Sequence, residues 1–145
     1  MALFFRNAPK ANDAMEELRA EYDNYRRRTA LQLQEADGAA ARRTAAAFLP
    51  LYDDLARALD HPCSDGAYYR GVELIFREMT EILAALGVKP MDSKGKIFNP
   101  AYHEAVEQVT DPALRGEEIA EVLQVGFTMD DEVIRHAKVI VANCQ

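Results

Sequence analysis

The stretch Ala20-Glu21-Tyr22-Asp23-Asn24-Tyr25-Arg26-Arg27-Arg28-Thr29 decides the fold, because its apolar positions belong to a pattern that steps by four, three and four residues. Such a pattern keeps a narrow apolar stripe on one face of a long helix. We expect this helix to lie in parallel against the same helix of a second chain. The positions predicted to form the dimer seam are Leu18, Tyr22, Tyr25, Thr29, Leu33 and Ala36.

The stripe repeats every eleven residues and continues in this period to Leu51. Eleven residues over three turns is about 3.67 per turn, close to the natural helical value, so paired helices need little supercoiling. A seven-residue frame would place Gln32 and Arg43 in the seam. A helix from about Ala11 to Leu49 would be roughly 58 Å long, too long for the rest of the chain to cover, which favours self-association. A solvated single helix, or one packed within its own chain, is the alternative.

The composition is that of a soluble globular protein of 145 residues and argues against several functions. A net charge of −7 is unfavourable for a general nucleic-acid binder. The arginines at 26–28 have Glu21 and Asp23 as neighbours, which indicates intrahelical ion pairs on a solvated face. Cys63 and Cys144 have no metal-binding neighbourhood, and a reducing cytoplasm is the default expectation. The apolar start of the chain is too short for a secretion signal or a membrane span.

Groups that could carry out catalysis are sparse. His103-Glu104 is a His–acid neighbour pair, but no serine or cysteine nucleophile stands near it in the sequence. The sequence also has no glycine-rich loop of the kind that cradles phosphate. We therefore expect no enzymatic activity, no cofactor, no bound metal and no direct nucleotide binding, and neither nucleic acid nor membrane as a partner.

Two further helices are predicted after the long one. The Leu49-Pro50 step should bend or restart the helix, because proline lacks a backbone donor and clashes with the preceding turn. A second helix would then reach about Leu59, and turn-forming residues at 60–66 would connect it to a third helix that stops at Gly87. Two such helices form a hairpin. In a dimer, two hairpins would make a four-helix bundle.

From Val88 onward the period falls to two, which predicts a small β-domain. Runs rich in β-branched residues occupy 105–109, 119–127 and 133–141, with a turn at 128–132 and a possible bulge at Gly126. In the last run Val133, Arg135, Ala137, Val139 and Val141 share one face. The fold class is thus α+β, with a short tail at 1–10, a dimerising long helix and hairpin at 11–87, and a C-terminal β-domain at 88–145.

The order of these parts, together with five local segments, resembles the GrpE family over about residues 18–142. The segments are Ala20-Glu21-Tyr22-Asp23-Asn24-Tyr25-Arg26-Arg27-Arg28, Leu49-Pro50-Leu51-Tyr52-Asp53-Asp54-Leu55-Ala56-Arg57-Ala58-Leu59, Gly71-Val72-Glu73-Leu74-Ile75, Phe98-Asn99-Pro100-Ala101-Tyr102-His103-Glu104-Ala105 and Val122-Leu123-Gln124-Val125-Gly126-Phe127.

The resemblance implies a homodimeric, cytoplasmic nucleotide-exchange factor for the bacterial Hsp70 chaperone DnaK. One β-domain would insert against the Hsp70 nucleotide-binding domain and hold its cleft open, so that ADP leaves, ATP enters and the client protein is released. Carried over by position, the contacts would come from Phe98, Pro100 and Leu123 in the β-domain, with polar contacts from Arg26 and Arg27 on the long helix and Arg57 in the bundle.

The resemblance also implies other roles, and each has an alternative. Gly71 would allow close packing that sets the angle of the β-domain, and His103 would be a packing or hydrogen-bonding residue. Phe98 and Leu123 could instead belong to the β-domain core. The acidic turn of Asp130, Asp131 and Glu132 departs from the family, which usually has an arginine at the last position; it is either a solvated turn or a contact for a basic patch.

A second class of function fits the same architecture. A dimeric coiled-coil adaptor could present two β-domains to another protein without affecting any nucleotide.

The sequence also departs from the family at its start, because members commonly have a long acidic N-terminal tail and more turns of paired helix.

Overall fold

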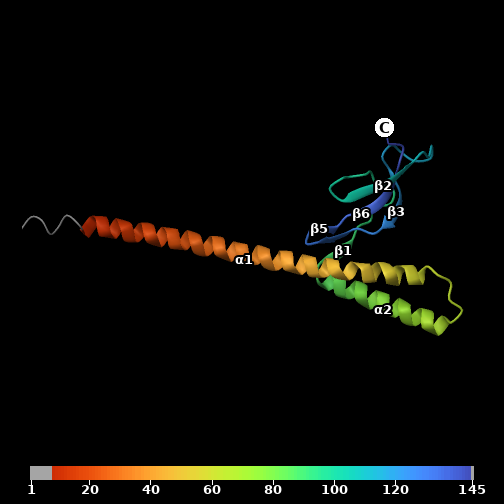
Figure 1. The fold of residues 1–145 in the computed structure, drawn as a ribbon, viewed down its shortest axis with the longest axis horizontal. Helices are drawn as coiled ribbons and strands as arrows, with labels where there is room; N and C mark the ends of the chain where they lie inside the picture. Colours follow the sequence, from red (N-terminus) through yellow and green to blue (C-terminus); the bar gives the residue numbers. More distant parts are fainter. Residues whose placement is uncertain (1–7, 145) are drawn as a thin grey trace, which may run out of the picture. The chain divides into compact units, whose positions relative to one another are not determined.

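The computed structural model describes residues 8–144, of which 8–85 are almost entirely helical and 88–142 carry short strands (Figure 1). The predicted α+β class is confirmed, whereas most of the expected tail at 1–10 lies outside the described residues. The chain divides into two compact units, one up to Ala41 and one from Arg42 onward. The elements are α1 (Ala8–Leu59), α2 (Gly66–Ala85), β1 (Val88–Pro90), β2 (His103–Val109), β3 (Ile119–Gln124), β4 (Phe127–Met129), β5 (Glu132–Arg135) and β6 (Ala137–Ala142).

In the first unit, the described residues form the N-terminal part of α1 and leave the predicted seam open. Leu18, Tyr22, Tyr25 and Leu33 are all more than half exposed within the single chain. Leu31 is exposed to a similar degree but lies outside the predicted seam. The stripe therefore has no cover from the described part of its own unit.

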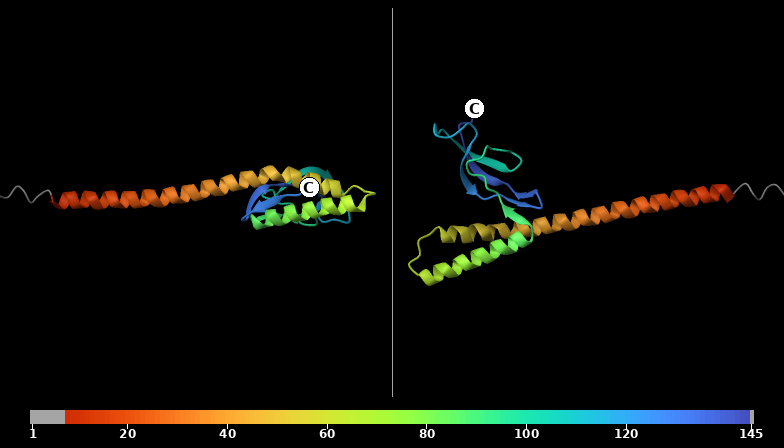
Figure 2. Two further views of the ribbon diagram at one scale, coloured as in Figure 1. Left: turned by 90° about the horizontal axis from the view of Figure 1, so that it is seen from below. Right: turned by 180° about the vertical axis from the view of Figure 1, so that it is seen from behind.

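In the second unit, the end of α1 and the whole of α2 form an antiparallel helical hairpin (Figures 1 and 2). The ring of Tyr52 lies 4.9 Å from that of Phe76, and the hydroxyl of Tyr69 donates to the carbonyl of Leu59. The loop at 60–65 ends at Asp65, whose side chain caps α2. Gly87 follows α2 with a φ of 84°, which is the left-handed conformation that glycine adopts most easily past a helix end.

Of the two outcomes expected at Pro50, a bend or a restart of the helix, the structure contradicts the restart. Pro50 lies inside α1, which runs unbroken to Leu59. Leu49, just before the proline, is completely buried, and Tyr52, just after it, packs against the same core. Contacts on both sides of Pro50 therefore hold the helical path, which offsets the backbone hydrogen bond that proline removes.

The hairpin and the strands share one hydrophobic core. Leu49 and Ala45 from α1 meet Leu83 from α2 and Phe127 from β4. One compact unit, from Arg42 onward, extends across residues 87 and 88. The buried members of this core are Ala45, Leu49, Leu83, Val88, Phe127 and Met129.

The strands form two three-stranded sheets rather than one continuous meander. The sheet β1-β4-β5 is antiparallel, whereas in β2-β6-β3 the central β6 pairs in parallel with β2 and antiparallel with β3. A second core is formed by Ile119 of β3 with Ala137, Val139 and Val141 of β6, the alternate residues predicted to share one face.

Two runs expected to be single strands are each divided. The run at 119–127 breaks between β3 and β4, and the run at 133–141 breaks at His136. At the first break, a Cβ on Gly126 would stand 2.5 Å from the backbone nitrogen of Ala137 and 2.6 Å from the sulfur of Met91. Glycine therefore permits a close crossing of backbones here, in place of the bulge expected at Gly126.

The turn between β4 and β5 agrees with the sequence. Asp130 and Asp131 form a two-residue connection, and their φ angles are 49° and 67°. Two consecutive left-handed residues are typical of a type I′ hairpin turn, for which aspartate is favoured. The acidic residues at these positions thus have a structural reason to be there.

Candidate partner-binding surface

A bidentate ion pair connects the helical hairpin to the strands. Asp53 lies on α1, one turn after Leu49, and Arg135 ends β5. The Arg135 guanidinium donates from Nη1 to Oδ2 of Asp53 at 2.6 Å and from Nη2 to Oδ1 at 2.8 Å. Both side chains are mostly buried, with 17% of Arg135 and 20% of Asp53 exposed. Paired N–H···O bonds of this kind fix orientation as well as distance.

The remaining groups of this ion pair are also bonded. Arg135 donates from Nε and Nη2 to the carbonyl of Val125 at 3.0 and 2.6 Å, and the Gln124 amide donates to Asp53 at 3.1 Å. The guanidinium also stands over the Phe127 ring, 5.3 Å from its centroid. Burial, and then the charge of Asp53, raise the pKa of the nearby Tyr52 hydroxyl above its ordinary value. The cluster therefore joins α1 to β5 and to the segment at 124–125.

Sequence reasoning missed this ion pair, although a signal for it was present. In the strand predicted at 133–141, Arg135 shares one face with Ala137, Val139 and Val141, which are all buried in the structure. A charged residue on an otherwise apolar face needs a partner of opposite charge. The identity of that partner, Asp53, could not be read from any local pattern.

Gly71, which was expected to set the angle of the β-domain through close packing, is exposed on α2. A Cβ built at Gly71 would meet nothing within 4 Å. Within the second unit, the strands are joined to the helices by the shared core and by the ion pairs Asp53–Arg135 and Arg42–Glu132. A packing role for Gly71 against a second chain stays a prediction.

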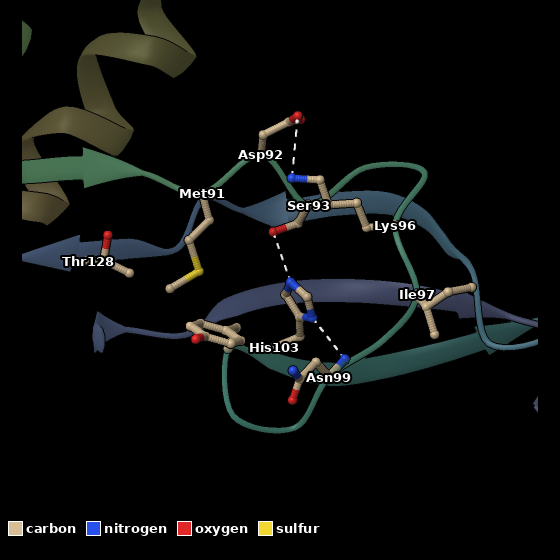
Figure 3. Close-up of a pocket in the computed structure, with 9 residues that line it drawn as sticks. Met91, Asp92, Ser93, Lys96, Ile97, Asn99, His103 and Thr128 are labelled. Atoms are coloured by element: carbon tan, nitrogen blue, oxygen red, sulfur yellow. Dashed lines mark hydrogen bonds and ion pairs between the residues drawn. The ribbon is translucent and has the colours of Figure 1, made fainter. Parts of the chain in front are cut away.

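His103 bonds to Ser93 and to Asn99 (Figure 3), and Asn99 is the residue between Phe98 and Pro100 in the sequence. The backbone N–H of Asn99 donates to Nδ1 of His103 at 3.0 Å, and the ring Nε2 lies 3.1 Å from the Ser93 hydroxyl oxygen. Since Nδ1 accepts, the proton of the neutral ring is on Nε2, which donates to Ser93. Burial lowers the pKa of His103 from its ordinary value, and the charges of Lys96 and His136 lower it further. The hydrogen-bonding role predicted for His103 is thus found in the structure.

The space beside His103 is an open pocket of about 360 Å³. Several of its polar lining groups bond to one another: Asp92 pairs with Lys96, and Ser93 and Asn99 bond to His103, and no buried side-chain polar atom lacks a partner among the described residues. Across residues 8–144, the structure contains no cluster of His, Cys, Asp and Glu that could hold a metal ion. The pocket therefore offers neither an unpaired buried polar group nor a ligand set, and we assign it to the support of the loop.

The three predicted β-domain contacts differ in how much surface they offer. Leu123 on β3 is 55% exposed. Pro100 is exposed in the loop, whereas Phe98 is half-buried and packs against the second core. Leu123 and Pro100 are therefore open to a partner, and much of Phe98 is packed inside the strand-bearing part of the second unit, residues 88–142, which we call the β-unit.

The predicted polar contacts lie apart in the sequence and are on the surface. Arg26 stands over the ring of Tyr22 at 6.0 Å, Arg27 is exposed, and Arg57 pairs with Asp54 at 3.2 Å. In the acidic turn, Glu132 pairs with Arg42 at 3.0 Å. The first two arginines belong to the first unit, and Arg57 to the second.

Comparisons with known proteins identify one family. A protein-family profile described as GrpE matches residues 1–143. A protein named Protein GrpE from Prosthecochloris aestuarii is 33% identical over 144 residues, which covers 94% of this chain and 70% of the relative. Proteins of the same name from Chlorobaculum tepidum and Clostridium acetobutylicum are 36% and 37% identical, covering 85% and 92% of this chain and 67% and 66% of the relatives.

The chain spans about two thirds of the length of these relatives. In the described part of the chain, no helix is both long enough and apolar enough to cross a membrane. The family is one of co-chaperones rather than of enzymes. The chain therefore belongs to the GrpE family, and this membership supports a co-chaperone role in nucleotide exchange for DnaK.

Proposed function

We propose that this protein binds the nucleotide-binding domain of a cytoplasmic Hsp70 chaperone of the DnaK type, opens its cleft and accelerates the release of ADP. ATP then enters and the client protein is released. The observation that carries the proposal is an exposed leucine, Leu123, on a β-unit that the Asp53–Arg135 ion pair attaches to the hairpin. Exposed apolar groups surrounded by polar ones are typical anchors of protein interfaces.

The physics of cleft opening requires both affinity and rigidity. A factor that binds the open, empty state better than the ADP-bound state lowers the affinity for ADP by the same coupling energy, because linkage is reciprocal. Moving the ratio of open to closed clefts from about 1:99 to about 99:1 needs a difference of about 5.5 kcal/mol between the binding free energies for the two states. A β-unit that shares a core with the hairpin can sustain such a difference, whereas a loosely tethered one would follow the cleft as it closed.

We also propose that the active form is a homodimer. Large apolar side chains are exposed along the predicted seam, and others, such as Phe48 and Leu51 on α1, are exposed on the hairpin. Burying them between two chains would stabilise the pair by roughly 1.5–3 kcal/mol for each fully buried large side chain. In this arrangement Arg26, Arg27 and Arg57 supply secondary polar contacts to the Hsp70 partner.

The direct test is stopped-flow release of fluorescent ADP from the DnaK nucleotide-binding domain, with and without this protein. We expect the release rate to rise by at least about 100-fold at saturation, as differential binding to the open cleft requires. Binding to DnaK without any change in the ADP release rate would refute cleft opening and favour the adaptor function.

The predicted contact can be tested against a matched residue on a different strand. Leu123→Ala should raise the protein concentration needed for half-maximal exchange by about tenfold or more, as expected for an interface anchor. Val106→Ala, on β2, removes a side chain of similar exposure, 51%, and should leave exchange unchanged. Equal effects of the two substitutions would remove the special role of Leu123. Thermal melts of both variants should match the wild type, since both side chains are exposed.

A further inference from the structure

We propose that the Asp53–Arg135 ion pair is the contact that sets the orientation of the β-unit relative to the helical hairpin, and that this orientation determines how far the partner's cleft is opened. The second part rests on the proposed function. The ion pair would act as a positioning contact and would not itself touch the partner.

The first support is geometric. Tyr52 and Asp53 follow Leu49 by three and four residues, so both lie on the same side of α1 as Leu49. Leu49 and Tyr52 bury apolar surface against the strands, and Asp53 binds Arg135 with two bonds of 2.6 and 2.8 Å. Apolar packing is non-directional and resists separation more than rotation. A bidentate guanidinium–carboxylate pair resists rotation, because both bonds weaken when either plane turns.

The second support is the position of the ion pair next to the predicted partner contact. Gln124 and Val125 follow Leu123 directly and both bond to the ion pair: Gln124 donates to Asp53, and Val125 accepts from Arg135. The backbone that carries Leu123 is thus connected to α1 by the hydrogen bonds among Gln124, Val125, Arg135 and Asp53. A change at Arg135 would therefore move Leu123 as well as the β5 strand.

The third support is the chemistry of arginine. Arg135 uses Nη1 and Nη2 for Asp53, and Nε and Nη2 for Val125, while its plane stands over Phe127. Lysine has a single compact ammonium group, which cannot form this set of bonds at once. Arg135→Lys should therefore keep the charge and lose the orientation, which separates a positioning role from simple charge pairing.

The two native cysteines make the orientation measurable without any partner. Cys63, in the interhelical loop, and Cys144, after β6, are both exposed thiols of the second unit. Spin labels on both thiols report the distance between the hairpin and the β-unit by pulsed electron paramagnetic resonance. An excess of unlabelled chain suppresses signals between two labelled chains. We expect a narrow distance distribution for the wild type and a clearly broader one for Arg135→Lys and Asp53→Asn. Asp53→Asn is the milder variant, since its amide oxygen can still accept one bond.

The matched control is Glu132→Gln, which weakens the other ion pair between α1 and β5, the one between Arg42 and the exposed Glu132. Its distance distribution should equal that of the wild type. Equal distributions in all four proteins would overturn the proposal, as would broadening in Glu132→Gln alone. Circular dichroism melts would identify any variant that is not folded at the temperature of the measurement.

Exchange assays then test the second part of the proposal. At saturating concentration, Arg135→Lys should lower the maximal rate of ADP release by about tenfold, because a misoriented unit shifts less of the partner's population to the open state. The half-saturating concentration should change less than the maximal rate. A reduced affinity with an unchanged maximal rate would overturn the link to cleft opening. If the wild-type protein did not accelerate ADP release from DnaK, the proposed function would fail. The distance measurement would still test the orientation of the β-unit.

Discussion

His103 shows how one residue couples the stability of the β-unit to pH. Its neutral ring accepts from Asn99 and donates to Ser93, and burial lowers its pKa from the ordinary value of 6.5. As the pH falls, the unfolded chain therefore takes up a proton at this residue before the folded chain does. The contribution of His103 to the free energy of unfolding is full above about pH 6.5 and is lost as the pH falls through the lower pKa of the folded state.

This predicts that His103→Gln reduces the dependence of stability on pH. The variant should be less stable than the wild type by about 1–3 kcal/mol at about pH 7.5, because it removes partners of Asn99 and Ser93. Denaturant unfolding at about pH 7.5 and about pH 5 measures the effect, and the gap between the two proteins should narrow at the lower pH. His61→Gln, at an exposed position of the interhelical loop, is the control and should follow the wild type. A gap that stays constant across this range would contradict the mechanism.

At the scale of elements, α2 depends on its N-cap. The Asp65 carboxylate accepts from the backbone N–H groups of Ala67 and Tyr68 at 3.0 and 3.1 Å. Asp65→Ala leaves these donors without a partner from the side chain and should lower the free energy of unfolding by about 1 kcal/mol. Asp65→Asn keeps a capping oxygen and should change the free energy of unfolding by only a few tenths of a kcal/mol. Chemical denaturation compares the two; an equal loss in both would assign the effect to the charge of Asp65 rather than to capping.

Element boundaries also show where local rules are insufficient. The turn at 128–132 was predictable because its aspartates suit left-handed positions. Pro50 was expected to bend or restart the helix, and the restart is not found, because the rule for proline considers only its own turn. Leu49 and Tyr52 pack against strands that lie far away in the sequence, and this packing decided the path of the helix.

For the whole molecule, the sequence was sufficient to predict the order of helices and strands and the class of fold, because both depend on the period of apolar residues. It was not sufficient to predict which apolar side chains face inward. Leu49 lies two positions before Leu51, where the predicted stripe ends, yet Leu49 is completely buried in the single chain. The ion pair between Asp53 and Arg135 spans 82 positions, so no periodicity could reveal it. What was missed is therefore long-range contact rather than local structure.

At the scale of the whole molecule, we predict that two chains associate through the long helix. Leu33 lies in the predicted seam and Leu31 does not, and the two are 63% and 56% exposed in the single chain. Residues two positions apart point to nearly opposite sides of a helix, at about 100° per residue. Leu33→Glu should therefore place two charges in the seam of a dimer and weaken it by about 100-fold or more, since each chain loses a buried leucine worth about 1.5–3 kcal/mol.

Leu31→Glu is the matched control for this prediction, because it makes the same chemical change on the other side of the helix and should leave the dimer intact. Sedimentation equilibrium over a range of protein concentrations measures both. Dissociation of the Leu31 variant alone would show that the stripe has been assigned to the wrong face. If both variants stayed dimeric with unchanged affinity, the long helix would not hold the chains together, and the exposed apolar face of the hairpin would have to supply the association.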